Sequence, residues 1–288
     1  MVKNIETISN ALKIVNKLKT LPSPPAVLGE ALKLTADPSV SYEKVAEVVS
    51  KDPNLTSRLL RIVNSPYYGL RQKVANLQLA LVILGIREFR LILISSAMVE
   101  ITKFKSLKNP LLFNKIWKNS FLMASIAKQL NTHLNFGYEG EEFVVGLLGN
   151  FGSLILLSEF PDQYSQIFQK SKNIRELLEN EFNEFKCSNS DIAYALFSKW
   201  ELPSILPDSI WRQYPLPYTP ISSAIEPNLA IIARLSRFAF EYISNRFSEP
   251  EFIEEALKNL NLQFENFIIT LDKLITEKIQ NLNLNGIE

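Results

Sequence analysis

The sequence predicts an all-α protein, and three features of its 288 residues carry this prediction. Apolar residues recur at spacings of three and four along most of the chain, which is the period of an amphipathic helix. Prolines and small polar residues that cap helices bound many of these apolar segments. Strict alternation of apolar and polar residues, which is typical of half-buried strands, is nowhere sustained.

The first hundred residues carry the signals of short helices: one with apolar residues from 5 to 18, a second from 27 to about 37, a third that follows Ser41, a fourth from 53 to about 64, and a stretch that begins at 76. Ser41 can cap the third of these helices, and Asp52, followed by Pro53, can cap the fourth. Residues 65–69 are expected to form a loop. Gly85 is expected to divide the fifth helical stretch, because glycine disfavours the interior of a helix.

Further helices are expected over residues 87–103, 110–134, 139–159, from 161, and over 174–185, 190–200, 203–214, 227–246, 250–260 and 264–281. The apolar stretch 143–158 is shorter than the ~18 residues that a membrane-spanning helix needs, so we expect a buried core helix there. Ser190 can cap the helix that follows it. The prolines between residues 215 and 220 predict a rigid, non-helical connector.

The composition is typical of a soluble, cytoplasmic protein. Hydrophobic residues make up 47% and charged residues 21% of the chain, which excludes a disordered sequence. The single cysteine, Cys187, excludes an internal disulfide and is typical of a reducing compartment. Lysines interrupt the N-terminal segment, so it lacks the apolar core of a signal peptide, and no membrane association is expected.

Several short motifs occur in an order that is found in one protein family. The most distinctive is VNSPYYG at residues 63–69, preceded by LPSPP at 21–25 and followed by ALVILG at 80–85. GLL at 146–148 and WELP at 200–203 continue the series. On these motifs the chain resembles the HDOD family, the HD-related output domain of bacterial signalling proteins.

The resemblance covers residues 15–217 and implies an HD-like multi-helix domain. Its helical N-terminal part would span about 15–105, and its HD-like part about 106–217. Residues 218–288 lie outside the resemblance, and we expect additional C-terminal helices there that pack on the domain or mediate self-association. Enzymes of the larger HD group hold one or two metal ions with His and Asp and hydrolyse phosphoesters. HDOD proteins resemble regulatory relatives whose catalytic site has decayed.

The metal site of the HD group cannot be assembled from this sequence. Such a site needs several imidazoles and at least one carboxylate, and the chain has one histidine. The resemblance places the following residues at the positions of the metal ligands: Asn119, Asn150, Asn189, Gln213 and Tyr214. These side chains bind metal ions poorly but form hydrogen bonds. Two alternatives stay open: the amides bind something polar, or they only satisfy buried backbone groups.

The family-like loop is expected to be structural. Its candidate residues are Asn64, Ser65, Tyr68 and Gly69. Asn64 ends a helix, and Gly69 can adopt the positive φ that a turn requires. The tyrosine can bury its ring while its hydroxyl finds a partner, which fixes the loop to the core.

Two other patterns also favour structural roles. The glycines at 146, 149 and 152 lack the Lys-Ser/Thr of a phosphate-binding loop, so we expect close packing of helices there. His133 and Cys187 lack the flanking sequences of known thiol enzymes, so Cys187 is expected to be a small buried apolar residue.

The net charge of +1 conceals an uneven distribution along the chain. Residues 51–138 contain 13 basic and 3 acidic residues, whereas residues 139–288 contain 12 basic and 22 acidic residues. The basic region can be a surface that faces nucleic acid, a nucleotide or an acidic partner. Alternatively, the acidic and basic regions neutralise each other within the protein.

The function that these observations favour is a non-catalytic regulatory binding module of bacterial signal transduction. It would act through protein–protein contacts or by sensing a small polar ligand, without a cofactor or a metal ion. One alternative is a residual HD-type phosphohydrolase acting on a nucleotide or cyclic dinucleotide. A second alternative is nucleic-acid binding through residues 51–138, which is disfavoured because base readout prefers arginine and this region is rich in lysine.

Overall fold

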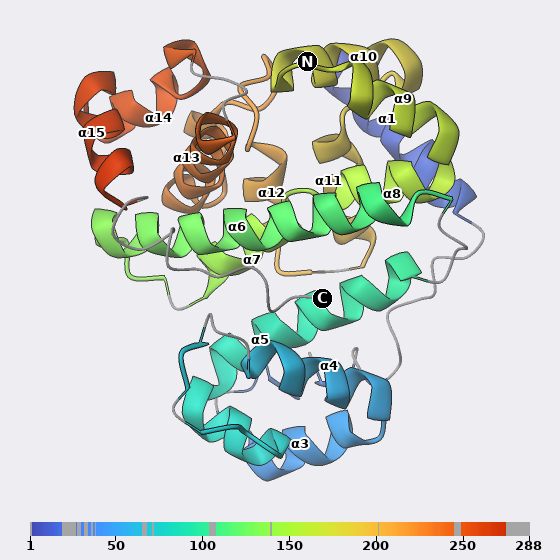
Figure 1. Ribbon diagram of the computed structural model, residues 1–288, viewed down its shortest axis with the longest axis vertical. Helices are drawn as coiled ribbons and strands as arrows, with labels where there is room; N and C mark the ends of the chain where they lie inside the picture. Colours follow the sequence, from blue (N-terminus) through green and yellow to red (C-terminus); the bar gives the residue numbers. More distant parts are fainter. Residues whose placement is uncertain are drawn as a thin grey trace. The chain divides into compact units, whose positions relative to one another are not determined.

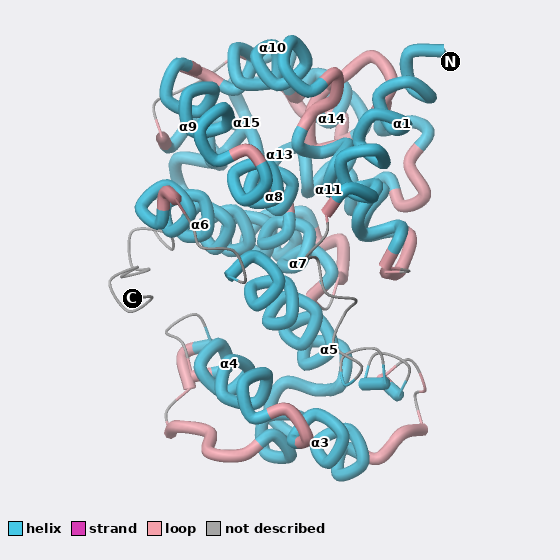
Figure 2. Tube along the Cα trace, turned by 90° about the vertical axis from the view of Figure 1, so that its right-hand side faces the viewer, coloured by secondary structure: helices cyan, strands magenta, loops and turns pink. Residues whose placement is uncertain are grey.

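The structure is a computed structural model. It describes residues 2–18, 27, 30–31, 34–35, 37, 39–64, 68–70, 72–103, 108–138, 140–200, 202–244 and 249–274. Every regular element in these ranges is a helix, so the predicted all-α fold class is confirmed (Figure 2). The predicted motif at 21–25 and most of the expected helix 27–37 lie outside the described residues.

The described residues form two compact units. The smaller unit contains residues 27–103, and the larger unit contains residues 2–18 together with 108–274. The N-terminal helix therefore belongs with the second half of the chain, which the sequence did not indicate. Compactness does not define family boundaries, so the division into 15–217 and 218–288 stays a prediction.

The smaller unit contains α3 (Tyr42–Ser50), α4 (Pro53–Val63) and α5 (Leu77–Lys103). Both predicted caps are confirmed: Ser41 Oγ accepts the backbone N–H of Lys44 at 3.2 Å, and Asp52 Oδ1 accepts that of Leu55 at 3.0 Å. Gly85 interrupts α5 with φ 76° and ψ 164°, as expected. The three helices enclose a separate core in which Leu55, Leu59 and Phe89 are fully buried.

The larger unit contains α1 (Val2–Lys17), α6 (Pro110–Leu134), α7 (Glu141–Leu148), α8 (Phe151–Glu159), α9 (Pro161–Lys170), α10 (Ile174–Phe185), α11 (Asn189–Lys199), α12 (Ile205–Trp211), α13 (Pro227–Ile243), α14 (Glu254–Asn259) and α15 (Phe264–Leu274) (Figure 1). Short 3-10 turns occur at Ile221–Ser223 and Pro250–Phe252. α1 packs against α11, and Lys199 Nζ donates to Asn16 Oδ1 at 2.9 Å between them.

The expected single helix over 139–159 is two helices. α7 ends at Leu148, and α8 begins at Phe151 after a turn at Gly149 and Asn150. The turn exposes the Gly149 carbonyl, which accepts hydrogen bonds from side chains on distant elements. By length and hydropathy alone, Glu141–Glu159 would pass as a membrane span, but 89% of its apolar window is buried inside the protein. This burial agrees with the buried core segment that the sequence predicted over residues 143–158.

The cap of α11 also differs from the sequence prediction. Ser188 caps this helix and Ser190 lies within it, because Asp191 completes a capping box with Ser188. Ser188 Oγ accepts the backbone N–H of Asp191 at 3.2 Å, and Asp191 Oδ2 accepts that of Ser188 at 2.7 Å. Asp191 lies three residues after Ser188, which is the spacing that the reciprocal bonds require.

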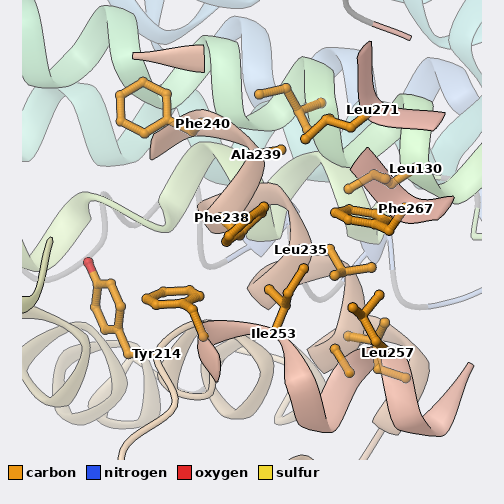
Figure 3. Packing of buried hydrophobic residues seen from close by; sticks show 14 of the residues in the cluster. Leu130, Tyr214, Leu235, Phe238, Ala239, Phe240, Ile253, Leu257, Phe267 and Leu271 are labelled. Atoms are coloured by element: carbon orange, nitrogen blue, oxygen red, sulfur yellow. The ribbon is translucent and has the colours of Figure 1, made fainter. Parts of the chain in front are cut away.

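α13 is central to the main core of the larger unit. Its residues Leu235 and Phe238 pack with Leu130 of α6 and with Phe267 and Leu271 of α15 (Figure 3). α13 also contacts α7 and α12. The helices after residue 217 therefore share one core with α6.

Candidate functional site

Three of the predicted site residues line one cavity in the larger unit. Asn119 comes from α6, Asn150 precedes α8, and Tyr214 follows α12. The cavity has a volume of about 30 Å³, two to three times the ~10–15 Å³ that a single water needs. Its walls contain both amides and apolar side chains.

The other two predicted residues lie one hydrogen bond behind the cavity. Tyr214 Oη donates to Asn189 Oδ1 at 3.2 Å, and Gln213 Nε2 donates to the Gly149 carbonyl at 2.8 Å. Asn189 and Gln213 are at most 1% exposed. The structure thus brings all five residues into one connected polar region.

A residue that the sequence reasoning missed, Arg237 of α13, organises this region. Its Nη2 donates to Asn150 Oδ1 at 2.7 Å, and its Nε and Nη2 donate to Gln213 Oε1 at 3.1 and 2.8 Å. Nη2 also lies 3.3 Å from the Gly149 carbonyl oxygen. The guanidinium stacks on the Tyr214 ring, 5.2 Å from its centroid, which is a cation–π contact.

Arg237 is paired with a buried acid on its own helix. Glu241 lies one turn later, and its Oε1 is 3.5 Å from Arg237 Nη1. The two side chains are 3% and 4% exposed. Both line the cavity, so its wall carries one positive and one negative group.

The sequence contained a signal for these buried arginines. Residues 229–240 are apolar on every side of the helix except for Ser236 and two arginines, Arg234 and Arg237. A helix that is apolar all round is buried, and a buried arginine needs bonded partners. Arg234 finds them in the carbonyls of Arg212 and Thr219, at 3.0 and 2.8 Å.

A second acid, Glu181 of α10, lies behind Asn189 and is fully buried. Its carboxylate accepts the Tyr164 hydroxyl at 2.8 Å and both the backbone and side-chain N–H groups of Asn189 at 2.8 to 3.1 Å. Burial raises its pKa to about 7 in spite of these bonds. Glu181 falls on the apolar stripe of α10 with Ile174 and Leu178, which was the signal that it is buried.

The residues of this region do not fit a hydrolytic metal centre. Among the described residues, no group of three or more His, Cys, Asp or Glu side chains is arranged to hold a metal ion. The oxygens of Asn150, Gln213 and Gly149 that face the centre of the region already bind the Arg237 guanidinium. A metal ion would have to displace this buried cation.

The remaining candidates are placed apart from the cavity. His133 is exposed at the end of α6, whereas Cys187 is fully buried, and burial raises the pKa of its thiol. In the loop, Asn64 donates to the Leu60 and Val74 carbonyls at 2.7 and 2.9 Å and accepts the Val74 N–H at 2.7 Å. Asn64 thereby ties the end of α4 to Val74.

The rest of the family-like loop is described in part. Tyr68 donates its hydroxyl to Glu88 Oε1 at 2.9 Å. Gly69 has φ +57°, the left-handed conformation expected for it. Ser65 lies outside the described residues.

The glycines of α7 and α8 confirm the expected close packing. A Cβ on Gly146 would lie 2.5 Å from Cα of Ala124, and one on Gly152 would lie 1.8 Å from the Asn189 carbonyl oxygen. Only glycine permits these two backbone approaches. The contact at Gly152 also positions the start of α11, where Asn189 receives its bonds.

The charge asymmetry is visible in one exposed ion pair, in which Lys108 Nζ lies 2.8 Å from Asp162 Oδ2. This pair joins the basic and acidic regions of the sequence within the larger unit. Among the other lysines of the basic region, the side chain of Lys103 and the whole of Lys105 lie outside the described residues.

Together, the fold and the site define an all-helical protein in which amides, a tyrosine and an arginine form one buried polar region. The family model of the HDOD domain matches residues 21–215. The chain therefore belongs to the HDOD family.

Solved structures with this fold carry different names. A protein from Shewanella amazonensis SB2B, provisionally named a phosphohydrolase, has a TM-score of 0.69 at 21% identity, over 92% of this chain and 94% of its own. A protein from Marinobacter aquaeolei VT8, provisionally named a signal transduction protein, has a TM-score of 0.70 at 19% identity, over 94% of this chain and 63% of its own. At these identities the likeness establishes the fold alone.

A curated relative extends beyond this chain. An uncharacterized protein of Treponema pallidum (strain Nichols) is 22% identical over 269 residues, covering 91% of this chain. The chain spans about half the length, 50%, of that relative.

Proposed function

We propose that this chain is a non-catalytic regulatory module of bacterial signal transduction that works in the cytoplasm. It acts by contact with a partner protein or by sensing a small polar ligand. Membership of the HDOD family and the signalling name of one protein with the same fold support the regulatory role. The site residues support the absence of catalysis.

The observation that carries the proposal is the buried guanidinium of Arg237 among the oxygens of Asn150, Gln213 and Gly149. A divalent metal 4 Å from this cation would be repelled by about 8 kcal/mol at an effective dielectric constant of about 20. Without a bound metal, no site residue makes a water acidic enough to attack a phosphoester near neutral pH. The Arg237 guanidinium thus supplies the positive charge in this region, and phosphoester hydrolysis has no metal-bound water as its nucleophile.

The size of the cavity argues against a nucleotide substrate. Its volume is about 30 Å³, whereas clefts that enclose ligands of nucleotide size measure roughly 300–1,000 Å³. Binding a cyclic dinucleotide would require the surrounding helices to separate. A ligand of a few heavy atoms fits without such a change.

Metal content and hydrolysis, measured on untagged protein, test the proposal. We expect far less than one equivalent of iron, manganese or zinc per chain by elemental analysis, and no turnover of nucleoside triphosphates or cyclic dinucleotides. Asn150→Ala removes a site amide, and Asn259→Ala removes an exposed amide on α14 as a matched control. One equivalent of metal, or hydrolysis that persists through repurification and disappears only in Asn150→Ala, would overturn the proposal.

A further inference from the structure

Two buried carboxylates lie beside the start of α11 without a partner of opposite charge. Glu181 and Asp191 are both fully buried. Among the described residues neither acid forms an ion pair, and the groups that bond to them are neutral: Tyr164 and Asn189 for Glu181, and Ser188, Trp211 and Tyr218 for Asp191. A buried carboxylate without a counter-ion becomes neutral by binding a proton. This part of the larger unit therefore contains a candidate proton-binding site.

The other titratable groups around Glu181 do not supply a positive charge. Burial raises the pKa values of three neighbours and keeps them neutral: Tyr164 of α9, Cys187 before α11 and Tyr214 after α12. The guanidinium of Arg237 stacks on the Tyr214 ring and bonds to neither acid. Asn189 Oδ1 accepts the Tyr214 hydroxyl, so this amide acts as a hydrogen-bond partner and not as a metal ligand. Burial, with a smaller contribution from the charge of Asp191, raises the pKa of Glu181 to about 7.

The hydrogen bonds identify the oxygen that can take the proton. In Asp191 both oxygens face N–H groups, from an indole at Oδ1 and from the backbone at Oδ2, and an N–H cannot accept. In Glu181, Oε2 accepts the backbone and side-chain N–H groups of Asn189 at 2.8 and 2.9 Å. Oε1 accepts the Tyr164 hydroxyl at 2.8 Å, with the same Asn189 amide further away at 3.1 Å. A hydroxyl can turn and accept, so Glu181 Oε1 can carry the proton while Oε2 keeps its bonds.

A chain of hydroxyl groups joins Glu181 Oε1 to the cavity. Ser153 of α8 is a side-chain hydrogen-bond partner of the Tyr164 hydroxyl, and it lines the cavity. The cavity volume of about 30 Å³ has room for water. When a hydronium ion in the cavity protonates Ser153 Oγ, the serine passes its own proton to Tyr164, and the tyrosine passes its own to Glu181. Each hydroxyl oxygen gains one O–H bond and loses one, so the net result is one proton moved from the cavity to the carboxylate.

We propose that Glu181 is a buried proton sensor that exchanges its proton with the cavity through Tyr164 and Ser153. In its protonated, neutral form it holds the start of α11 against α10 through Asn189. Loss of the proton places a second negative charge near Asp191, which caps the same helix. The start of α11 is therefore held less firmly as the pH rises through neutrality, and the module responds to pH.

Infrared spectra recorded between pH 6 and pH 8 test whether Glu181 binds the proton. We expect one buried protonated carboxyl group at pH 6 that disappears by pH 8 and that is absent from Glu181→Gln. Glutamine has the shape of the protonated acid, since its NH₂ group can donate to Tyr164 and its oxygen can accept from Asn189, so this variant should fold. Glu179→Gln, at an exposed position of α10, is the matched control. No titrating carboxyl group in this range, or the same one in Glu181→Gln, would overturn the proposal.

Hydrogen exchange tests the response of α11. A carboxyl group with a pKa of about 7 in the native state and about 4.5 in the unfolded chain loses most of its stabilising proton between pH 6 and pH 8. After correction for the intrinsic exchange rate, protection of the first turn of α11 should fall about tenfold over this range. Protection in Glu181→Gln should stay constant. An equal fall in both proteins would show that another group causes the response and would overturn the sensor role.

A rapid pH jump tests the route of the proton. Trp211 donates to Asp191 at 2.7 Å, so its fluorescence reports on the charge near this acid. Ser153→Ala leaves every bond of Glu181 in place but interrupts the route, so relaxation after a jump from pH 6 to pH 8 should slow at least about tenfold with an unchanged amplitude. Ser171→Ala, at another serine of the cavity wall, is the control. Equal rates in Ser153→Ala and the wild-type protein would overturn the assigned route. None of these measurements depends on metal content or hydrolysis, so their failure leaves the proposed function in place.

Discussion

Replacing Gly152 by alanine should disrupt the contact between α8 and α11. The new Cβ would lie 1.8 Å from the Asn189 carbonyl oxygen and 2.6 Å from its carbonyl carbon. Ordinary van der Waals contact begins at 3.4 Å. Both obstructing atoms belong to the backbone, so no side-chain rotation relieves the clash, and the two helices must move apart.

The expected loss of stability combines three contributions. The first contribution is stabilising, because alanine favours the helical conformation over glycine by up to about 1 kcal/mol. Overpacking a core costs about 1–3 kcal/mol or more. Moving Asn189 also weakens its backbone bond to Glu181, now 2.8 Å long, and an unsatisfied buried donor costs about 1–3 kcal/mol. The net destabilisation is about 3 kcal/mol, which lowers the melting temperature by roughly 6–12 °C in a protein of this size.

Thermal and urea unfolding followed by circular dichroism measure this effect. Gly149→Ala is the matched control, because the atoms nearest to its Cβ would be the ends of the Gln213 and Met123 side chains, both at 3.0 Å, and the closest backbone atom, the Val145 carbonyl oxygen, would lie at 3.3 Å. We expect this control to lose less than half as much stability. Equal melting temperatures for Gly152→Ala and the wild-type protein would refute the argument that glycine is required at this contact.

Three further outcomes are expected. Burial raises the pKa of Glu181 to about 7, so the native state binds more protons than the unfolded chain between about pH 4.5 and 7, and stability should fall as the pH rises through that range. Urea unfolding at several pH values should show this slope, and Glu181→Gln should flatten it; a wild-type stability that rises over the same range would contradict the assigned shift. Asn64→Ala removes three hydrogen bonds, two of them to Val74, and should cost about 2 kcal/mol in the smaller unit. Hydrogen exchange in α4 and α5 should accelerate, and unchanged protection would show that the loop is held in another way. Titration with duplex and single-stranded oligonucleotides should show no binding that weakens steeply between about 50 and 200 mM salt; micromolar, salt-sensitive binding would instead support recognition through residues 51–138.

Local sequence determined where α3 and α4 begin and where α5 is interrupted. Ser41 and Asp52 cap α3 and α4 through bonds that span three residues, and Gly85 interrupts α5 by its own backbone freedom. Such interactions depend only on neighbours along the chain, so spacing and residue type were sufficient to predict them. Where the prediction was wrong, at Ser190, two serines lay close together, and the position of Asp191 decided which one caps the helix.

Interruptions of a helix that depend on partners far along the chain could not be predicted from local sequence. The turn between α7 and α8 exposes the Gly149 carbonyl to Gln213 and Arg237, which lie 64 and 88 residues further on. Local periodicity continues through this turn, so the sequence predicted one helix. The free energy that favours the break comes from hydrogen bonds that exist only after the chain has folded.

The sequence by itself determined the all-helical class and showed that one histidine is too few for an HD-type metal centre. It also singled out the amides that the structure brings together in one polar region. Only the tertiary structure decided that Arg237 and Glu241 of α13 complete that site, because both lie beyond the motifs that carried the resemblance. A buried charge is stable only beside partners that the fold supplies, so its role is set by long-range packing and cannot be read from its neighbours in the chain.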